Sequence, residues 1–70
     1  MNNSKIIVNG KLETFTAKNI SGLLLQKGIT PDMKGIAVAI NGVVVPRDFW
    51  ETRNISSGDE VEIVKPFKGG

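Results

Sequence analysis

The sequence predicts an α+β protein in which one helix lies across a mixed sheet of four or five strands. Asn-Gly pairs at positions 9–10 and 41–42 each separate two short β-branched runs, and both residues tolerate the positive φ angles of a two-residue hairpin turn. Leucines recur at helical spacing within residues 20–28, and a last alternating run follows at residues 60–65. The order hairpin, helix, hairpin, strand is typical of an α+β domain.

The composition excludes several classes of function. A chain of 70 residues forms one domain with a small core. The absence of cysteine and histidine removes the thiol nucleophile, the thiolate metal site and the usual proton shuttle. The basic residues are spread along the chain at a net charge of +2, which is a poor footprint for nucleic acid. No apolar run reaches the length of a membrane span. We therefore expect a cytoplasmic protein that binds no metal and has no catalytic residues of its own.

The first predicted hairpin spans residues 5–16. Successive side chains of a strand point to opposite faces, so Ile6 and Val8 share one face, which we assign to the core. Ile7 then lies on the opposite face. On the second strand the alternation is imperfect, and Phe15 is expected to be buried.

The helix is predicted within residues 20–28. Asn19 is a suitable N-cap, because its side chain can accept a hydrogen bond from a free amide of the first turn. Gly28 suits the left-handed residue that follows a helix. Gly22 is unfavourable inside a helix, so the helix must depend on packing its leucines against the sheet.

The second predicted hairpin spans residues 36–45. Val38 and Ile40 are expected to face the core. Pro46 ends the second strand, because proline cannot donate a hydrogen bond to a sheet.

Residues 47–50 are predicted to form an irregular or helical turn. Trp50 is expected to fold back into the core. Arg47 lies at the rim, where it can pack its aliphatic stem and pair with a local acid such as Asp48. An anion site at Arg47 is the less common alternative.

The last strand is predicted at residues 60–65, with Val61 and Ile63 pointing inward. Val64 falls on the opposite face, and Pro66 prevents the strand from continuing. The preferred handedness of crossovers places the first and last strands side by side and parallel, with the helix between them in sequence. The last strand is then central in the sheet.

The chain ends in Gly69-Gly70. Glycine has no Cβ, so these residues can pass through a channel too narrow for a side chain, and the carboxylate of Gly70 is then the reactive group. A frayed terminus is the alternative, but a central strand that runs into the glycines favours a presented tail. We therefore divide the chain into a domain at residues 1–66 and a flexible tail at 67–70.

Apolar side chains are expected on the sheet face that the helix does not cover. Ile7 and Val64 both fall there, where a solvated sheet normally carries polar groups. A partner that recognises this patch would also meet Lys65, Phe67 and Lys68, and the lysines would steer an acidic groove. The alternative is that loops cover both apolar residues or that the assigned strand parity is off by one.

Nearly the whole chain resembles the ThiS family, the sulfur carriers of thiamine biosynthesis. Val45-Pro46-Arg47 followed by Trp50 is the most discriminating part. The other matching segments are Asn19-Ile20 before the leucines, Ile36 to Asn41, Ser57 to Val64 and the terminal Gly69-Gly70. Gly22 departs from the family pattern, and residues 11–18 match it loosely.

The resemblance implies a β-grasp, ubiquitin-like fold and a carrier that is not itself an enzyme. A ThiF-type adenylating enzyme would use ATP and magnesium to activate the Gly70 carboxylate. A persulfide donor would convert the adenylate to a thiocarboxylate, and the sulfur would pass to the thiazole synthase ThiG. The carrier itself would bind no cofactor.

Two other classes of function stay open. A carrier like MoaD, the small subunit of molybdopterin synthase, or a ubiquitin-like protein modifier would share the fold and the Gly-Gly end. A β-grasp interaction domain would share the fold but perform no chemistry at its carboxylate.

Overall fold

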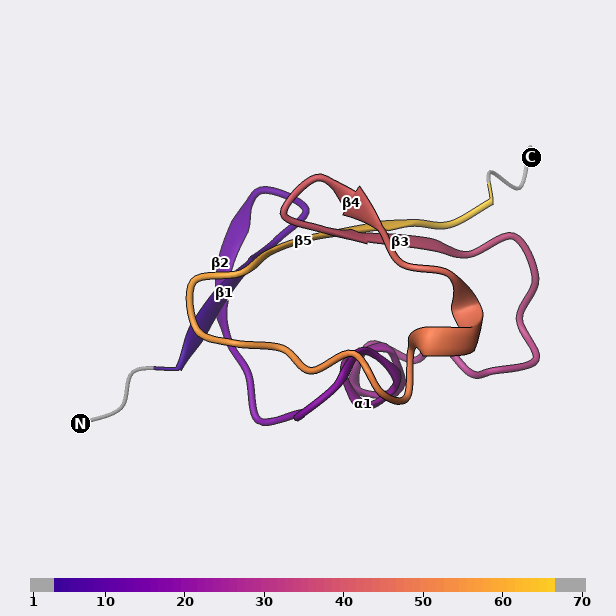
Figure 1. Ribbon diagram of the computed structural model, residues 1–70, viewed down its shortest axis with the longest axis horizontal. Coiled ribbons are helices and arrows are strands. Elements are labelled where there is room, and N and C mark those ends of the chain that lie inside the picture. The colour runs from indigo at the N-terminus through magenta and orange to yellow at the C-terminus, as the bar shows by residue number, and fades with distance from the viewer. Residues whose placement is uncertain (1–3, 67–70) are drawn as a thin grey trace.

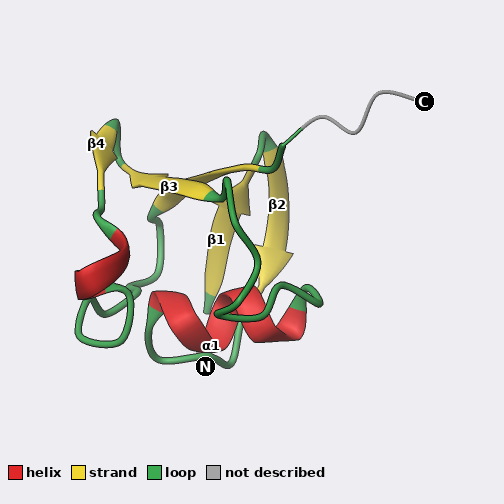
Figure 2. Cartoon of the chain, turned by 90° about the vertical axis from the view of Figure 1, so that its right-hand side faces the viewer, coloured by secondary structure: helices red, strands yellow, loops and turns green. Residues whose placement is uncertain are grey.

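A single sheet of five strands, with one α-helix packed on one of its faces, forms the protein (Figures 1 and 2). This computed structural model describes residues 4–66, and residues 1–3 and 67–70 lie outside the description. The elements are β1 (Lys5–Val8), β2 (Lys11–Thr14), α1 (Ile20–Gln26), β3 (Ala37–Ile40), β4 (Val43–Val44), the 3₁₀ helix η1 (Arg47–Phe49) and β5 (Glu60–Val64). The predicted α+β class and element order are confirmed.

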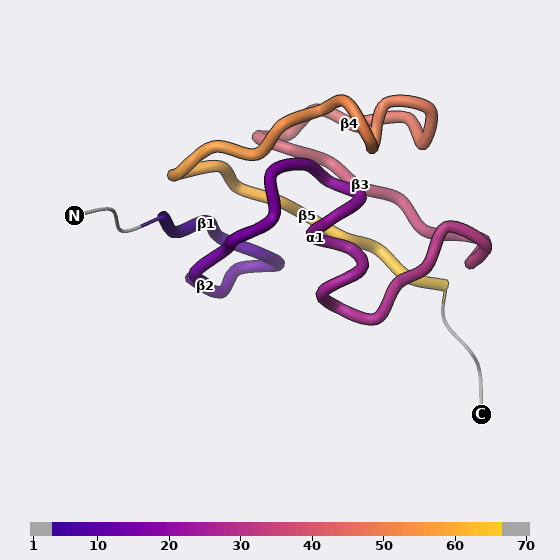
Figure 3. The backbone as a smooth tube through the Cα atoms, turned by 90° about the horizontal axis from the view of Figure 1, so that it is seen from below, coloured from indigo at the N-terminus to yellow at the C-terminus, as the bar shows by residue number. Residues whose placement is uncertain are grey.

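The last strand occupies the centre of the sheet, whose strand order is β2-β1-β5-β3-β4. β5 pairs with β1 in parallel and with β3 in antiparallel orientation. Figure 3, viewed from the helix side, shows β5 running between the two hairpins. The predicted parallel pairing of the first and last strands is confirmed.

Both Asn-Gly pairs form the predicted hairpin turns. Asn9 and Gly10 have φ angles of 50° and 84°, and Asn41 and Gly42 have 52° and 83°. Two successive residues with positive φ are the mark of a type I′ turn, whose twist matches that of the flanking strands.

The helix has the predicted caps at both ends. The side chain of Asn19 accepts a hydrogen bond from the Gly22 amide at 2.8 Å. Gly28 has a φ of 80°, and the Ile29 amide beyond it donates to the Leu24 carbonyl at 2.8 Å. This reverse turn closes the helix and brings Ile29, which is buried, back to the core.

The structure also gives a reason for Gly22. A Cβ at this position would lie 3.2 Å from the Cβ of Ala17 and 3.3 Å from the capping oxygen of Asn19. The glycine therefore lets the chain before the helix pass close to its first turn.

The core lies between α1 and the facing side of the sheet. Its most deeply buried side chains are Ile6, Ile20, Val38, Ile40 and Val61. The residues of β1, β3 and β5 predicted to point inward are buried. Phe15, also predicted to be buried, follows the end of β2 and is only partly buried against the core. Within residues 4–66 no helix is long and apolar enough to cross a membrane.

Trp50 fills the core beneath η1, as predicted, and its Nε1 donates to the Val45 carbonyl at 2.8 Å. The Arg47 guanidinium lies 4.5 Å from the centre of the Trp50 ring. The expected pairing of Arg47 with Asp48 is wrong. Arg47 instead donates to two backbone carbonyls, those of Pro31 and Met33, which match the spacing of its forked donors.

Candidate functional site

The candidate site is the end of β5, where the chain leaves the sheet through Lys65 and Pro66. Four of the residues proposed from the sequence, Phe67, Lys68, Gly69 and Gly70, lie outside the described residues. The structure therefore describes the base from which they extend.

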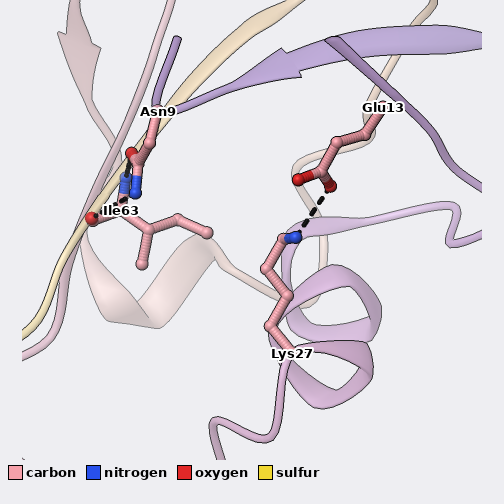
Figure 4. A network of polar contacts seen from close by, with 4 residues as sticks. All are labelled: Asn9, Glu13, Lys27 and Ile63. Atoms are coloured by element: carbon pink, nitrogen blue, oxygen red, sulfur yellow. Dashed lines mark hydrogen bonds and ion pairs between the residues drawn. The ribbon is translucent and has the colours of Figure 1, made fainter. Parts of the chain in front are cut away.

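The end of β5 is held on one side by a side chain. β1 pairs with β5 only as far as Val8 and Val61, since the chain then turns away at Asn9. The Asn9 side chain continues the pairing: its Oδ1 accepts from the Ile63 amide at 2.8 Å and its Nδ2 donates to the Ile63 carbonyl at 3.1 Å (Figure 4). Both backbone groups of Ile63 on this side of the strand are thereby satisfied.

The asparagine of the second hairpin holds the opposite end of β5. The Oδ1 of Asn41 accepts from the Glu60 amide at 2.9 Å, and its Nδ2 donates to Asp59 at 3.1 Å. The sequence indicated both asparagines as turn residues but not as anchors of β5. The two anchors fix the register of the strand that leads into the C-terminal segment.

Pro66 rests against the connector between α1 and β3. Gly35 in this connector has a φ of 79°, and a Cβ built on it would lie 3.1 Å from Cγ of Pro66. Only glycine suits both the backbone angle and the close approach. The Gly35 contact therefore supports the chain where it leaves the sheet.

Val64 and Ile7 both lie on the sheet face opposite α1. Val64 is 59% exposed, and Ile7 is partly buried. The register places them apart, because Ile7 is aligned with Glu60 at the start of β5 and Val64 with Ala37 at its end. Val64 is therefore the apolar side chain at the base of the C-terminal segment, with Lys65 next to it.

A groove on the helix side of the same strand is rich in lysine. Lys11, Lys27 and Lys65 line it together with Asn9 and Ile63. Lys27 forms an ion pair with Glu13 at 2.7 Å across the groove (Figure 4). Both side chains are partly exposed, so the ion pair contributes little to stability.

None of the polar or charged side chains in residues 4–66 is buried. No group of three or more acidic side chains within residues 4–66 is arranged to hold a metal ion. The pKa of the Asp32 carboxyl is lowered because the Thr30 hydroxyl donates a hydrogen bond to it, but this carboxyl lies on an exposed turn. The site that the structure describes is therefore the anchored end of β5 and the surfaces beside it.

Comparisons with known proteins agree with this arrangement. The ThiS family matches residues 6–70. A crystal structure of the thiamine biosynthesis protein ThiS from Geobacter metallireducens is similar to this chain, with 28% identity, a TM-score of 0.76 and coverage of 94% of this chain and 99% of that one. A solution NMR structure of a thiamine biosynthesis protein from the same organism gives the same identity and TM-score and is covered over 87% of its length. No curated protein matches. The chain belongs to the ThiS family of thiamine-biosynthesis sulfur carriers.

Proposed function

We propose that the carboxylate of Gly70 carries the sulfur, as a thiocarboxylate, that is used to build the thiazole of thiamine. The observation that supports this most is the position of β5. The central strand of a ThiS-family fold runs directly into the C-terminal segment, and anchors at Asn9 and Asn41 fix its register. The carboxylate would then project from a defined point on a rigid body.

The proposed chemistry needs no side chain from the carrier. A carboxylate resists acyl transfer until one of its oxygens becomes part of a leaving group. A ThiF-type enzyme would supply this by joining the Gly70 carboxylate to AMP from magnesium-bound ATP, with release of pyrophosphate. The terminal sulfur of a persulfide would then attack the acyl carbon and displace AMP. A thiol would cleave the remaining sulfur–sulfur bond and leave the thiocarboxylate on Gly70.

Gly69 would let the C-terminal segment pass through a narrow channel of the adenylating enzyme and would take no part in the reaction itself. The adenylating enzyme must bring the Gly70 carboxylate to bound ATP, and a narrow channel keeps water from the reactive adenylate. Gly69 has no side chain to obstruct such a channel and can take backbone angles that other residues avoid.

Partner recognition would begin at the base of the C-terminal segment. Val64 is the exposed apolar contact there, and Lys65 and Lys68 would steer association with an acidic groove. Phe67 would add apolar contact, and Ile7 would contribute only to a partner that covers much of the outer sheet face. The adenylating enzyme and the thiazole synthase ThiG would use this surface in turn.

Intact-mass spectrometry tests the proposal. The chain is incubated with a ThiF-type enzyme, magnesium, ATP, a persulfide donor and a thiol. The expected product has one oxygen replaced by sulfur, and a chain lacking Gly70 provides the control that should not change. An unchanged parent mass would refute the proposal. Joining of Gly70 to a lysine of another protein would instead support a ubiquitin-like modifier, and sulfur transfer to a molybdopterin precursor rather than through ThiG would support a MoaD-type carrier.

A further inference from the structure

The connector between α1 and β3 links Arg47 to the end of β5. It begins after the buried Ile29 and passes beside η1 before it reaches Pro66 at the end of β5 (Figure 1). Residues 31–35 are all exposed and belong to no helix or strand. Such a segment has few contacts of its own to hold it in one conformation.

Arg47 supplies the hydrogen bonds that tie this connector to the rest of the domain. Its two terminal nitrogens donate to the Pro31 carbonyl at 2.8 Å and the Met33 carbonyl at 2.9 Å. Within residues 4–66, the other hydrogen bonds of residues 30–35 join only members of the turn itself, namely Thr30, Asp32 and Met33. Both bonds that enter this turn from elsewhere therefore come from one side chain.

The Trp50 ring holds the Arg47 guanidinium in place. The guanidinium stacks over the Trp50 ring at 4.5 Å, a favourable arrangement for a cation and an aromatic face. Trp50 is buried, and its Nε1 is fixed to the Val45 carbonyl. The core thus positions Arg47, and Arg47 positions the turn at residues 30–33.

The same connector then forms the support for Pro66. Gly35 follows the Arg47-bound turn by two residues and meets the Pro66 ring at a distance that leaves no space for a side chain. We infer that Arg47 is a positioning residue for the activation of the C-terminal carboxylate. It holds the connector so that Gly35 sets the direction in which the chain leaves the sheet at Pro66.

The inference rests on the proposed function, and it predicts an effect on rate rather than on docking. Arg47 belongs to η1 and does not lie on the sheet face that carries Val64, so its loss removes no contact residue from that face. If the position of Pro66 is less fixed, the Gly70 carboxylate spends less time in the geometry that reacts with ATP. Misplacement of a reacting group by about 1 Å lowers rates by up to about 100-fold. The change should therefore appear in kcat of carrier adenylation rather than in KM.

The test compares Arg47→Gln and Arg47→Lys with Arg53→Gln, a control whose arginine donates to the carbonyl of its neighbour Asn54. Nuclear magnetic resonance of the free proteins reports the amide shifts of Gly35 and Lys65. ATP–pyrophosphate exchange with a ThiF-type enzyme reports kcat and the KM for the carrier. We expect Arg47→Gln to shift both amides and lower kcat about tenfold with KM within about twofold. Arg47→Lys should recover little, because an ammonium lacks the planar fork. Arg53→Gln should match the parent.

Each contrary result has a separate meaning. If the parent chain supports no exchange, the proposed function fails and this inference falls with it. If the parent is active and Arg47→Gln keeps its kcat, or if the Gly35 and Lys65 amides stay unchanged, only the inference is overturned. A loss of rate that merely follows the unfolded fraction, measured by circular dichroism in the same buffer, would also overturn it, as would equal losses in Arg53→Gln.

Discussion

The side-chain amide of Asn9 pairs with both backbone groups of Ile63, a residue that lies 54 positions further along the chain. The hairpin turn directs the backbone away from β5 after Val8. The Asn9 side chain therefore forms the hydrogen bonds to Ile63 that a further residue of β1 would otherwise form. Asn9 also adopts the left-handed backbone angle that the turn requires. One residue therefore shapes the first hairpin and anchors the strand that leads to the C-terminal segment.

Replacing Asn9 should weaken the fold in a way that separates these two roles. Asn9→Gly keeps the backbone angle but leaves the amide and carbonyl of Ile63 without their partner, so we expect a loss of about 1–2 kcal/mol in the free energy of unfolding. Asn9→Ala should lose more, because alanine also disfavours positive φ. Urea denaturation measures both. Equal stability of Asn9→Gly and the parent would show that water replaces the amide without loss.

Deleting Gly70, or adding one residue after it, should abolish adenylation without changing the melting temperature. The proposed reacting group is the terminal carboxylate, and the buried core of the described residues includes none after Ile63. ATP–pyrophosphate exchange and thermal melting measure the two properties. Exchange by the extended chain would exclude the proposed chemistry.

Gly69→Val tests the proposed passage. Valine is wider than glycine and is stiff about its first side-chain torsion, so the variant should melt like the parent and yet fail in adenylation or in sulfur transfer. Gly69→Ala offers a smaller change and should retain part of the activity. Equal turnover of the valine variant would remove the steric argument.

Val64→Asp should weaken binding to the adenylating enzyme while preserving the fold. Val64 is 59% exposed, so its replacement costs the core little, but the new charge must lose water when a partner covers it. Leu12→Asp is a matched control, since Leu12 is 66% exposed on the distant strand β2. Isothermal titration calorimetry should show at least about a tenfold loss of affinity for Val64→Asp alone.

The contrary results of this experiment define the extent of the contact surface. Unchanged affinity of Val64→Asp would exclude the base of the C-terminal segment as a contact. A similar loss for Leu12→Asp would extend the surface to Ile7, which is the cross-strand neighbour of Leu12.

The sequence predicted the features that local chemistry determines. Asn-Gly requires a tight turn, alternation assigns Val61 and Val64 to opposite faces, and an N-cap beside a leucine stripe begins a helix. These rules depend on neighbours in the chain, and the structure confirms each of them.

Features that depend on the register between distant segments were missed. Parity placed Ile7 and Val64 on one face, but only the alignment of β1 with β5 shows that they lie apart. The sequence offers Asp48 as the local partner of Arg47, whereas the fold brings two backbone carbonyls from another loop to the Arg47 guanidinium. No local sequence pattern predicts that the Asn9 side chain bonds to both backbone groups of Ile63. Asparagine is equally expected in a turn whose side chain contacts no other strand.

The central position of the last strand has a consequence for synthesis on the ribosome. β1 and β3 do not pair with each other, and β5 alone joins the two hairpins into one sheet. Isolated two-stranded hairpins are at best marginally stable in water. A nascent chain that stops before residue 60 therefore holds two hairpins that no strand joins, and its helix has no complete sheet to cover. Folding is complete only after the ribosome has reached the strand from which the C-terminal glycines extend.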